Sequence, residues 1–200
     1  MKIETLDVAG FQPAIRAMRN PMDSWAKSDS AWDTVGEKDK ELSLRLQKAG
    51  PEHCKHLRMI IVWADITAPR FWWNEFDTYR AGVEKVSCST MHRMMARPLK
   101  PDDFEPCNGE LYGLPFVEVT EYINEMIEDY KAESDPVKKR MDWEFVIQLL
   151  PQSYRQKRTV MMSYAALRNI YRQREGHKLK QWQEFREWVE SLPESWMITE

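Results

Sequence analysis

The sequence predicts an α+β fold that is mostly helical with a small central sheet. Three observations carry this prediction: several segments repeat apolar residues at spacings of three and four, two segments are short and β-prone, and Pro or Gly separates them. Apolar residues make up 42% of the 200 residues and aromatic residues 12%, enough to form a sizeable core. We therefore expect a single domain over residues 1–200, with its core in residues 36–200.

In the first half, turn-forming and polar residues predict an irregular N-terminal arm over residues 1–35. Leucines among charged residues, followed by Gly-Pro, predict a helix over 37–49. Residues 56–67 are rich in Ile, Val and Trp, which is typical of a buried strand. Aromatic residues spaced by three and four favour a helix over 70–80, with its aromatic side chains in the core.

The second half is predicted to be mainly helical. A Pro- and Gly-rich connector over 98–115 is too polar to form core. Asp135-Pro136 opens one helix, and Ser163 caps a later one. The predicted elements are helices over 119–130, 136–150, 164–174 and 179–189, and a strand over 157–163.

Composition excludes several classes of protein. A net charge of −3 excludes a generally basic nucleic-acid coat, and no run of 18 apolar residues is present to span a membrane. The N-terminus lacks the apolar region of a signal peptide. The three cysteines are odd in number and form no CxxC pair, which favours the reducing cytoplasm. No metal site is predicted, because the only ligand-like His and Cys spacing is the weak His53/His56 pair.

One cation lies on a packing face. Arg174 follows Leu167 and Ile170 at helical spacing, and a buried guanidinium needs a carboxylate or an anionic ligand as its partner. On this spacing alone, an Arg that complements the end of its helix is the favoured interpretation. Asn169 and His177 lie nearby in the sequence, where a surface amide and a loop histidine are the simpler interpretations.

A second candidate region surrounds residues 80–90. Arg80 precedes Ala81-Gly82, small residues that let the backbone approach a ligand. The segment "SCST" over 87–90 offers hydroxyl and N–H groups that could cradle a phosphate, although most such clusters are polar loops. Cys88 has His92 four residues later, but this spacing does not favour a cysteine nucleophile.

Two stretches resemble the flavin-dependent thymidylate synthases. The first, "HLRMIIVWADITAPRFWWNEFDTYRAGVEKVSCSTMHR", contains Ala-Pro after a strand, an aromatic helix, and "TYR" and "VSCSTM" at the two halves of the family signature R-H-R-x-x-S-x-N-E-x-S-x-R. The second, "LLPQSYRQKRTVMMSYAALRNIYRQREGHKLKQWQEFREW", resembles the family's C-terminal segment. The matching positions are Leu150-Pro151, Asn169, Arg174, His177, Gln181-Trp182 and Arg186. The short chain with its degenerate signature also resembles phage-encoded members.

The signature itself departs from the family pattern. The first Arg, the central His and the last Arg are replaced by Thr78, Tyr79 and Met91. Val86-Ser87 replaces the Asn-Glu pair, and Ile147 stands where the family has an Arg. The other departures are Ser163 and Ala165, which replace an Asn and an Arg that hold the flavin.

The resemblance implies a family-like fold, a dUMP-like pyrimidine nucleotide, methylation at C5 with reduced FAD and a folate donor, and a homotetramer. It assigns Arg80 and Arg174 to substrate and catalysis. The remaining implied contacts are Ser87, Ser89 and Thr90 for the phosphate, and Tyr79, Asn169 and His177 for the flavin. Because a lost electrostatic contact typically costs about a hundredfold or more in rate, a non-catalytic nucleotide-binding protein is the alternative. A purely structural or interaction protein is a third reading.

Overall fold

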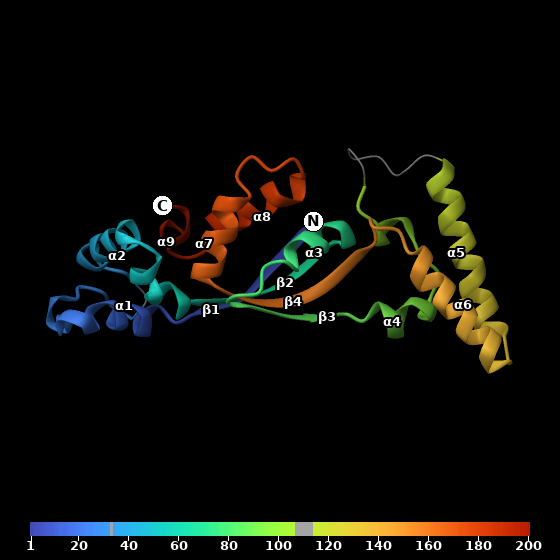
Figure 1. Cartoon of the computed structure of the whole chain (residues 1–200), viewed down its shortest axis with the longest axis horizontal. Coiled ribbons are helices and arrows are strands. Elements are labelled where there is room, and N and C mark those ends of the chain that lie inside the picture. Colours follow the sequence, from blue (N-terminus) through green and yellow to red (C-terminus); the bar gives the residue numbers. More distant parts are fainter. Residues whose placement is uncertain (33, 107–113) are drawn as a thin grey trace. The chain divides into compact units, whose positions relative to one another are not determined.

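The computed structural model describes residues 1–32, 34–106 and 114–200, and within these it contains helices and one four-stranded sheet (Figure 1). The strands are β1 (Lys2–Ala9), β2 (Ile61–Pro69), β3 (Val83–Ser87) and β4 (Arg155–Ser163). They form an antiparallel sheet in the order β1-β2-β4-β3. The helices are α1 (Phe11–Arg19), α2 (Glu37–Ala49), α3 (Arg70–Phe76), α4 (Thr90–Arg93), α5 (Leu114–Ala132), α6 (Pro136–Leu149), α7 (Tyr164–Gln173), α8 (Lys180–Glu190) and α9 (Trp196–Thr199). The predicted α+β class is confirmed.

Two compact units can be distinguished within the chain. Unit 1 comprises residues 67–76 and 87–158 together with Met1, and unit 2 comprises residues 2–66, 77–86 and 159–200. Compact units of this kind do not by themselves decide how many folding domains a chain has, so the single domain over 1–200 stays a prediction. No helix in the described ranges is both long and apolar enough to traverse a bilayer.

The core of unit 1 lies around the side-by-side helices α5 and α6 (Figure 1). Its buried members are Met94, Met95, Leu99, Phe104, Ile123, Ile127, Val146 and Leu150. The carboxylate of Asp135 accepts a hydrogen bond from the N–H of Val137 at 2.9 Å, which confirms the predicted start of α6. Helix α5 begins five residues before its predicted start at 119, whereas α6 agrees with the predicted 136–150 to within one residue.

The predicted connector over 98–115 contributes to this core, so the expectation that it would not is wrong. A short 3-10 helix (Pro101–Asp103) turns the chain and buries Phe104, whose ring lies 4.9 Å from that of Phe116. Leu99 is also buried. The segment is mostly polar, but its Leu99 and Phe104 are part of the unit 1 core. Residues 107–113 of the connector lie outside the described residues.

Helix α3 carries the predicted aromatic core. Trp72, Trp73 and Phe76 are completely buried, and the indole N–H of Trp73 donates to the carbonyl oxygen of Gln156 at 2.9 Å. The guanidinium carbon of Arg158 lies 4.2 Å from the centre of the Trp73 ring. The helix ends at Phe76 rather than near residue 80, so it is shorter than predicted.

The first elements of unit 2 contradict the prediction of an irregular arm over residues 1–35. Strand β1 has little buried apolar surface, and backbone pairing with β2 within the sheet stabilises it. Helix α1 buries Ala14, Ile15 and Met18, which repeat at spacings of one, three and four. This periodicity is present in the sequence, although turn-forming residues surround it.

Strand β2 begins at Ile61, later than predicted, because residues Lys55–Arg58 form a 3-10 turn. Ser163 caps α7 as predicted, since its hydroxyl accepts a hydrogen bond from the N–H of Ala166 at 3.2 Å. The short helix α9, beyond Pro193, was not predicted.

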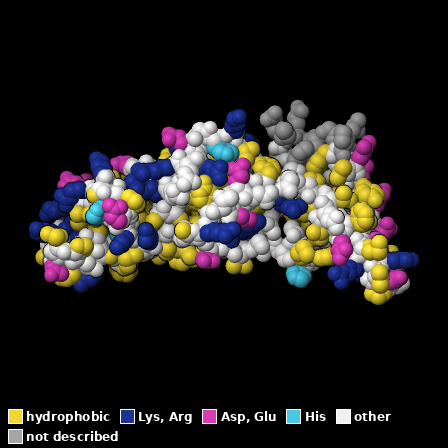
Figure 2. All heavy atoms as spheres, in the orientation of Figure 1, with side chains coloured by type: hydrophobic (Ala, Val, Ile, Leu, Met, Phe, Trp, Pro, Cys, Tyr) yellow, Lys and Arg dark blue, Asp and Glu magenta, His cyan; other side chains and the backbone are white. Residues whose placement is uncertain are grey.

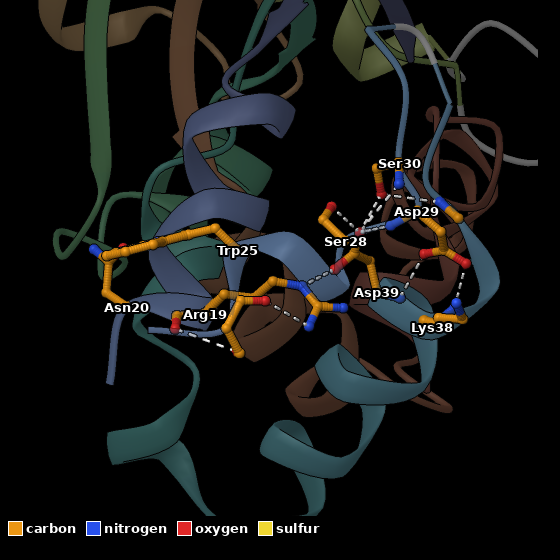
Figure 3. A network of polar contacts seen from close by, with 10 residues as sticks. Arg19, Asn20, Trp25, Ser28, Asp29, Ser30, Lys38 and Asp39 are labelled. Carbon is orange, nitrogen blue, oxygen red and sulfur yellow. Dashed lines mark hydrogen bonds and ion pairs between the residues drawn. The ribbon is translucent and has the colours of Figure 1, made fainter. Parts of the chain in front are cut away.

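A buried ion pair holds α1 to α2 in unit 2 (Figure 3). The Nε of Arg19 donates to Asp39 at 2.5 Å, and the hydroxyls of Ser28 and Ser30 donate to the other carboxylate oxygen at 2.5 and 2.7 Å. Burial raises the pKa of Asp39, but the hydrogen bonds from Ser28, Ser30 and Arg19 outweigh it, so the pKa lies below its usual range. Arg19 therefore already has an anionic partner within unit 2.

Candidate functional site

Unit 1 contains a cavity of about 470 Å³ whose charged lining residues are all cations. It lies where β4 begins and where the segment between β3 and α4 passes. The charged and hydroxyl-bearing side chains of the lining are Arg93, Arg97, Arg155, Lys157, Thr67, Ser89, Thr90 and Tyr154. Such a lining attracts an anion and offers hydrogen-bond donors to it.

Backbone pairing positions the two sides of this cavity. The N–H of Cys88 donates to the carbonyl oxygen of Lys157 at 2.9 Å, and the side-chain amide of Gln156 donates to the carbonyl oxygen of Cys88 at 2.9 Å. The hydroxyl of Ser89 accepts from the N–H of His92 at 3.3 Å and starts α4, which brings Arg93 to the cavity one turn later. Ser89 and Thr90 are therefore brought to one cavity.

The cations of the cavity differ in how they are balanced. Arg97 makes two hydrogen bonds of 2.6 and 2.7 Å to the carboxylate of Asp103, and these raise the pKa of Arg97. Arg155 donates to the buried carboxylate of Glu105 at 2.8 Å. Arg93, by contrast, is exposed and has no ion pair within the described residues. It is the guanidinium best placed to receive a ligand anion.

Tyr154 adds a neutral donor to the same cavity. Burial raises the pKa of its phenol above the usual value, so the hydroxyl stays protonated at neutral pH. Its ring also packs at 6.0 Å from the ring of Phe104 in the core of unit 1. The cavity thus combines charged groups with one fixed aromatic side chain.

A second group of predicted residues comes together in unit 2. The Nε of Arg174 donates to the hydroxyl of Tyr79 at 2.8 Å, and its guanidinium carbon lies 4.3 Å from the ring centre of the buried Trp182. The ring of His177 lies 6.1 Å from that of Trp182, and its Nδ1 accepts from the N–H of Leu179 at 3.2 Å. Aromatic faces hold the Arg174 cation, as expected for an arginine that packs at a helix end.

Three predicted site residues belong to neither group. Arg80 is exposed, and its side chain makes no hydrogen bond or ion pair within the described ranges. Ser87 is exposed and does not line the unit 1 cavity. Asn169 is exposed, and its side-chain oxygen accepts from the amide of Gln173 at 2.9 Å. The binding roles assigned to the eight predicted site residues stay predictions. These residues are Tyr79, Arg80, Ser87, Ser89, Thr90, Asn169, Arg174 and His177.

The close backbone approach expected at Gly82 is present, but toward the protein itself. Gly82 has a φ of +71°, and a Cβ at this position would lie 2.5 Å from the hydroxyl of Ser163. The small residue thus serves the packing of β3 beside the cap of α7.

Sequence reasoning missed most of the cations in the unit 1 cavity. Arg155 and Lys157 are two residues apart on β4, and therefore lie on one face of the strand. Arg93 follows Ser89 by four residues, which is one helical turn. Both spacings can be read from the sequence, but they indicate one cavity only if the segment around Ser89 is known to pair with β4. Within the described ranges, no group of three or more His, Cys, Asp or Glu residues is arranged to hold a metal ion.

Comparison with known proteins shows the fold. No protein-family model matches the sequence, and the curated proteins give no significant match. Thymidylate synthase X from Helicobacter pylori, crystallised with FAD and dUMP, matches the structure with a TM-score of 0.73 at 18% identity, over 100% of this chain and 98% of that one. A flavin-dependent thymidylate synthase from Helicobacter pylori, also complexed with FAD and dUMP, matches over the same shares with a TM-score of 0.71 at 18% identity. The chain therefore has the fold of the flavin-dependent thymidylate synthases.

Proposed function

We propose that this chain binds a pyrimidine nucleotide of the dUMP type, with its phosphate in the unit 1 cavity. The observation that carries the proposal is the cationic and hydroxyl-rich lining, which has no acidic side chain of its own. The volume of about 470 Å³ falls in the range of roughly 300 to 1,000 Å³ that is typical of small-molecule sites. The similarity in fold to complexes with dUMP supports the pyrimidine base.

The lining residues offer two kinds of contact to a phosphate, charged and neutral hydrogen bonds. Arg93 offers a planar pair of donors to the phosphate oxygens, and the hydroxyls of Ser89 and Thr90 add neutral hydrogen bonds. The hydroxyl oxygen of Ser89 accepts a hydrogen bond from the N–H of His92, so the hydroxyl proton is still available to donate to a phosphate oxygen. The family resemblance separately assigns Arg80, Ser87 and Arg174 to the nucleotide, and these three assignments stay predictions.

A titration with dUMP tests this proposal. We expect dUMP to raise the melting temperature of the protein, and deoxyuridine, which lacks the phosphate, to have little effect. Replacing Arg93 by Gln removes one charge-assisted contact and should weaken dUMP binding about tenfold, as measured by isothermal titration calorimetry. The exposed Arg140→Gln is the matched control and should bind as the wild type does. If no nucleotide stabilises the wild type, or if Arg93→Gln binds dUMP equally well, the proposal is wrong.

Methylation at C5 with FAD and a folate donor is the second candidate, favoured by the similarity to complexes with FAD. The residues present fit FAD only poorly. Ser163 is buried as the cap of α7, Tyr79 is bonded to Arg174, and the Nδ1 of His177 is occupied by the N–H of Leu179. Of the three predicted flavin contacts, Asn169 is exposed, whereas Tyr79 and His177 are half-buried and already hydrogen-bonded within the chain, so we derive no flavin step. An absorbance band between the near-ultraviolet and blue in freshly purified protein would favour this candidate over simple nucleotide binding.

We further propose that the chain forms a homo-oligomer, a tetramer by the family resemblance. Helix α6 exposes an apolar stripe with one residue every four positions, and Figure 2 shows hydrophobic side chains gathered over α5 and α6. The stripe consists of Val137, Met141, Phe145 and Leu149. Because the opposite face of α6 is in the core, the helix is apolar on two sides, which is typical of a helix covered on both. Light scattering coupled to size exclusion measures the mass directly, and a monomer at all concentrations would contradict this proposal.

A further inference from the structure

A second cavity, in unit 2, combines apolar side chains with cations and has no acidic side chain in its lining. It has a volume of about 520 Å³ and lies between α2 and the end of α1 with the 3-10 turns that follow. We call it the α1–α2 cavity. It shares no residue with the unit 1 cavity, so a ligand here is independent of the proposed nucleotide site. Its charged lining residues are Arg19, Lys27, Lys38, Arg45 and His53.

Helix α2 presents both kinds of side chain to this cavity. Lys38, Leu42, Arg45 and Leu46 are spaced by four, three and one positions, so they share one side of the helix. Lys38 and Arg45 are exposed, whereas the two leucines are half-buried. The cations therefore lie at the solvent edge of the cavity, and the leucines lie deeper.

Two methionines add to the apolar lining from α1 and from the turn after it. Met18 is buried, whereas Met22 is 81% exposed. Methionine side chains are flexible and adapt their shape to apolar partners. No aromatic ring lines the cavity, so it offers aliphatic contacts but no surface on which a base could stack.

The cations of this cavity differ in how they are balanced. Arg19 is bonded to Asp39, and the ring of His53 lies 3.6 Å from the carboxylate of Glu52. The other three cations are exposed and make no side-chain hydrogen bond or ion pair within the described residues. A group of cations without an internal anion produces a positive potential that attracts an anionic ligand. The three are Lys27, Lys38 and Arg45.

We propose that the α1–α2 cavity binds an aliphatic carboxylate, with its chain against the leucines and methionines and its carboxylate among the three unpaired cations. Two of these cations are lysines, which are compact point charges and lack the planar pair of donors with which arginine selects a phosphate. The volume lies in the range of roughly 300 to 1,000 Å³ that is typical of small-molecule sites. A carboxylate that carries a chain uses both kinds of lining, whereas a small inorganic anion uses only the cations.

Calorimetric titration of the full-length protein with octanoate, hexanoate and octylammonium tests both parts of the proposal. Each methylene group that leaves water strengthens binding about fourfold, so we expect octanoate to bind roughly tenfold more tightly than hexanoate. Octylammonium has the same chain but the opposite charge, and we expect no detectable binding. Equal affinities for octanoate and hexanoate, or binding of octylammonium as tight as that of octanoate, would overturn the proposal.

A charge-removing double variant, Lys38→Gln with Arg45→Gln, locates the binding in this cavity. We expect it to bind octanoate about tenfold more weakly than the wild type does. The matched control, Lys48→Gln with Lys55→Gln, removes the same charge from exposed positions outside the cavity and should bind as the wild type does. All four positions are exposed, so both variants should fold, and thermal unfolding checks this.

Three results would show that the α1–α2 cavity is not a carboxylate site. The wild type could fail to bind octanoate, or the folded Lys38 and Arg45 double variant could bind it with unchanged affinity. The third is an equal loss of affinity in the double variant and in its control, because binding would then depend on the overall charge of the protein.

Discussion

Replacing Asp39 by Asn is expected to lower the free energy of unfolding by about 3 kcal/mol. The change leaves Arg19 as a buried charge without its partner, and breaking a buried pair in this way costs about 3 to 5 kcal/mol. We place the effect at the lower end, because an Asn oxygen could still accept hydrogen bonds from Ser28 and Ser30. Urea denaturation at pH 7 measures the difference.

The acid dependence gives a second readout of the same pair. Since the pKa of Asp39 is lowered in the folded state, its contribution is fully present above a pH of about 4 and is lost as the pH falls toward the lowered value. Asp39→Asn should lack this part of the acid-dependent loss. Asp102→Asn, at an exposed position, serves as the control and should stay within about 0.5 kcal/mol of the wild type. Equal stability of the Asp39 and Asp102 variants would show that the buried pair is not stabilising.

Gly10→Ala is expected to destabilise unit 2 by about 3 kcal/mol. Gly10 has a φ of +102°, a conformation that costs an L-residue about 1 to 2 kcal/mol. In addition, a Cβ there would lie inside van der Waals contact with the carbonyl oxygen of Met59 and 3.0 Å from its carbonyl carbon. Overpacking of this kind adds about 1 to 3 kcal/mol, because backbone must move. Thermal and urea unfolding of the variant give the measurement.

Gly176→Ala provides a matched comparison. Gly176 also has a positive φ, of +63°, but a Cβ there meets no atom within 4 Å. We expect it to cost only about 1 kcal/mol, the conformational part alone. The difference between the two variants therefore measures the crowding at Met59, and similar losses at both positions would contradict the role given to that contact.

Local patterns predicted much of the fold because they are set within a few residues. The caps at Asp135 and Ser163 and the periodicity of α5 depend on neighbours two to four positions away. Strand β1 could not be predicted in this way, since its stability comes from pairing with β2, a segment more than fifty residues later. Phe104 was missed for a similar reason, as its burial requires the distant Phe116 and Tyr154.

The candidate site was less predictable than the fold. The family resemblance pointed to Ser89 and Thr90, which do line a cationic cavity. Its cations, however, come from segments that the signature does not include, and no local pattern indicates that Arg155 and Lys157 lie beside Ser89. Arg174 illustrates the opposite case, because the interpretation from spacing alone, a packed arginine at a helix end, describes its contacts with Tyr79 and Trp182.

The apolar stripe on α6 has a consequence for how this protein behaves in dilute and concentrated solution. If copies of the chain cover that face by associating, folding and assembly draw on the same buried surface, and mass action links them. The chain would then resist heat better at high concentration than at low concentration. Dilution alone would return the stripe to water and weaken the helix pair that carries it.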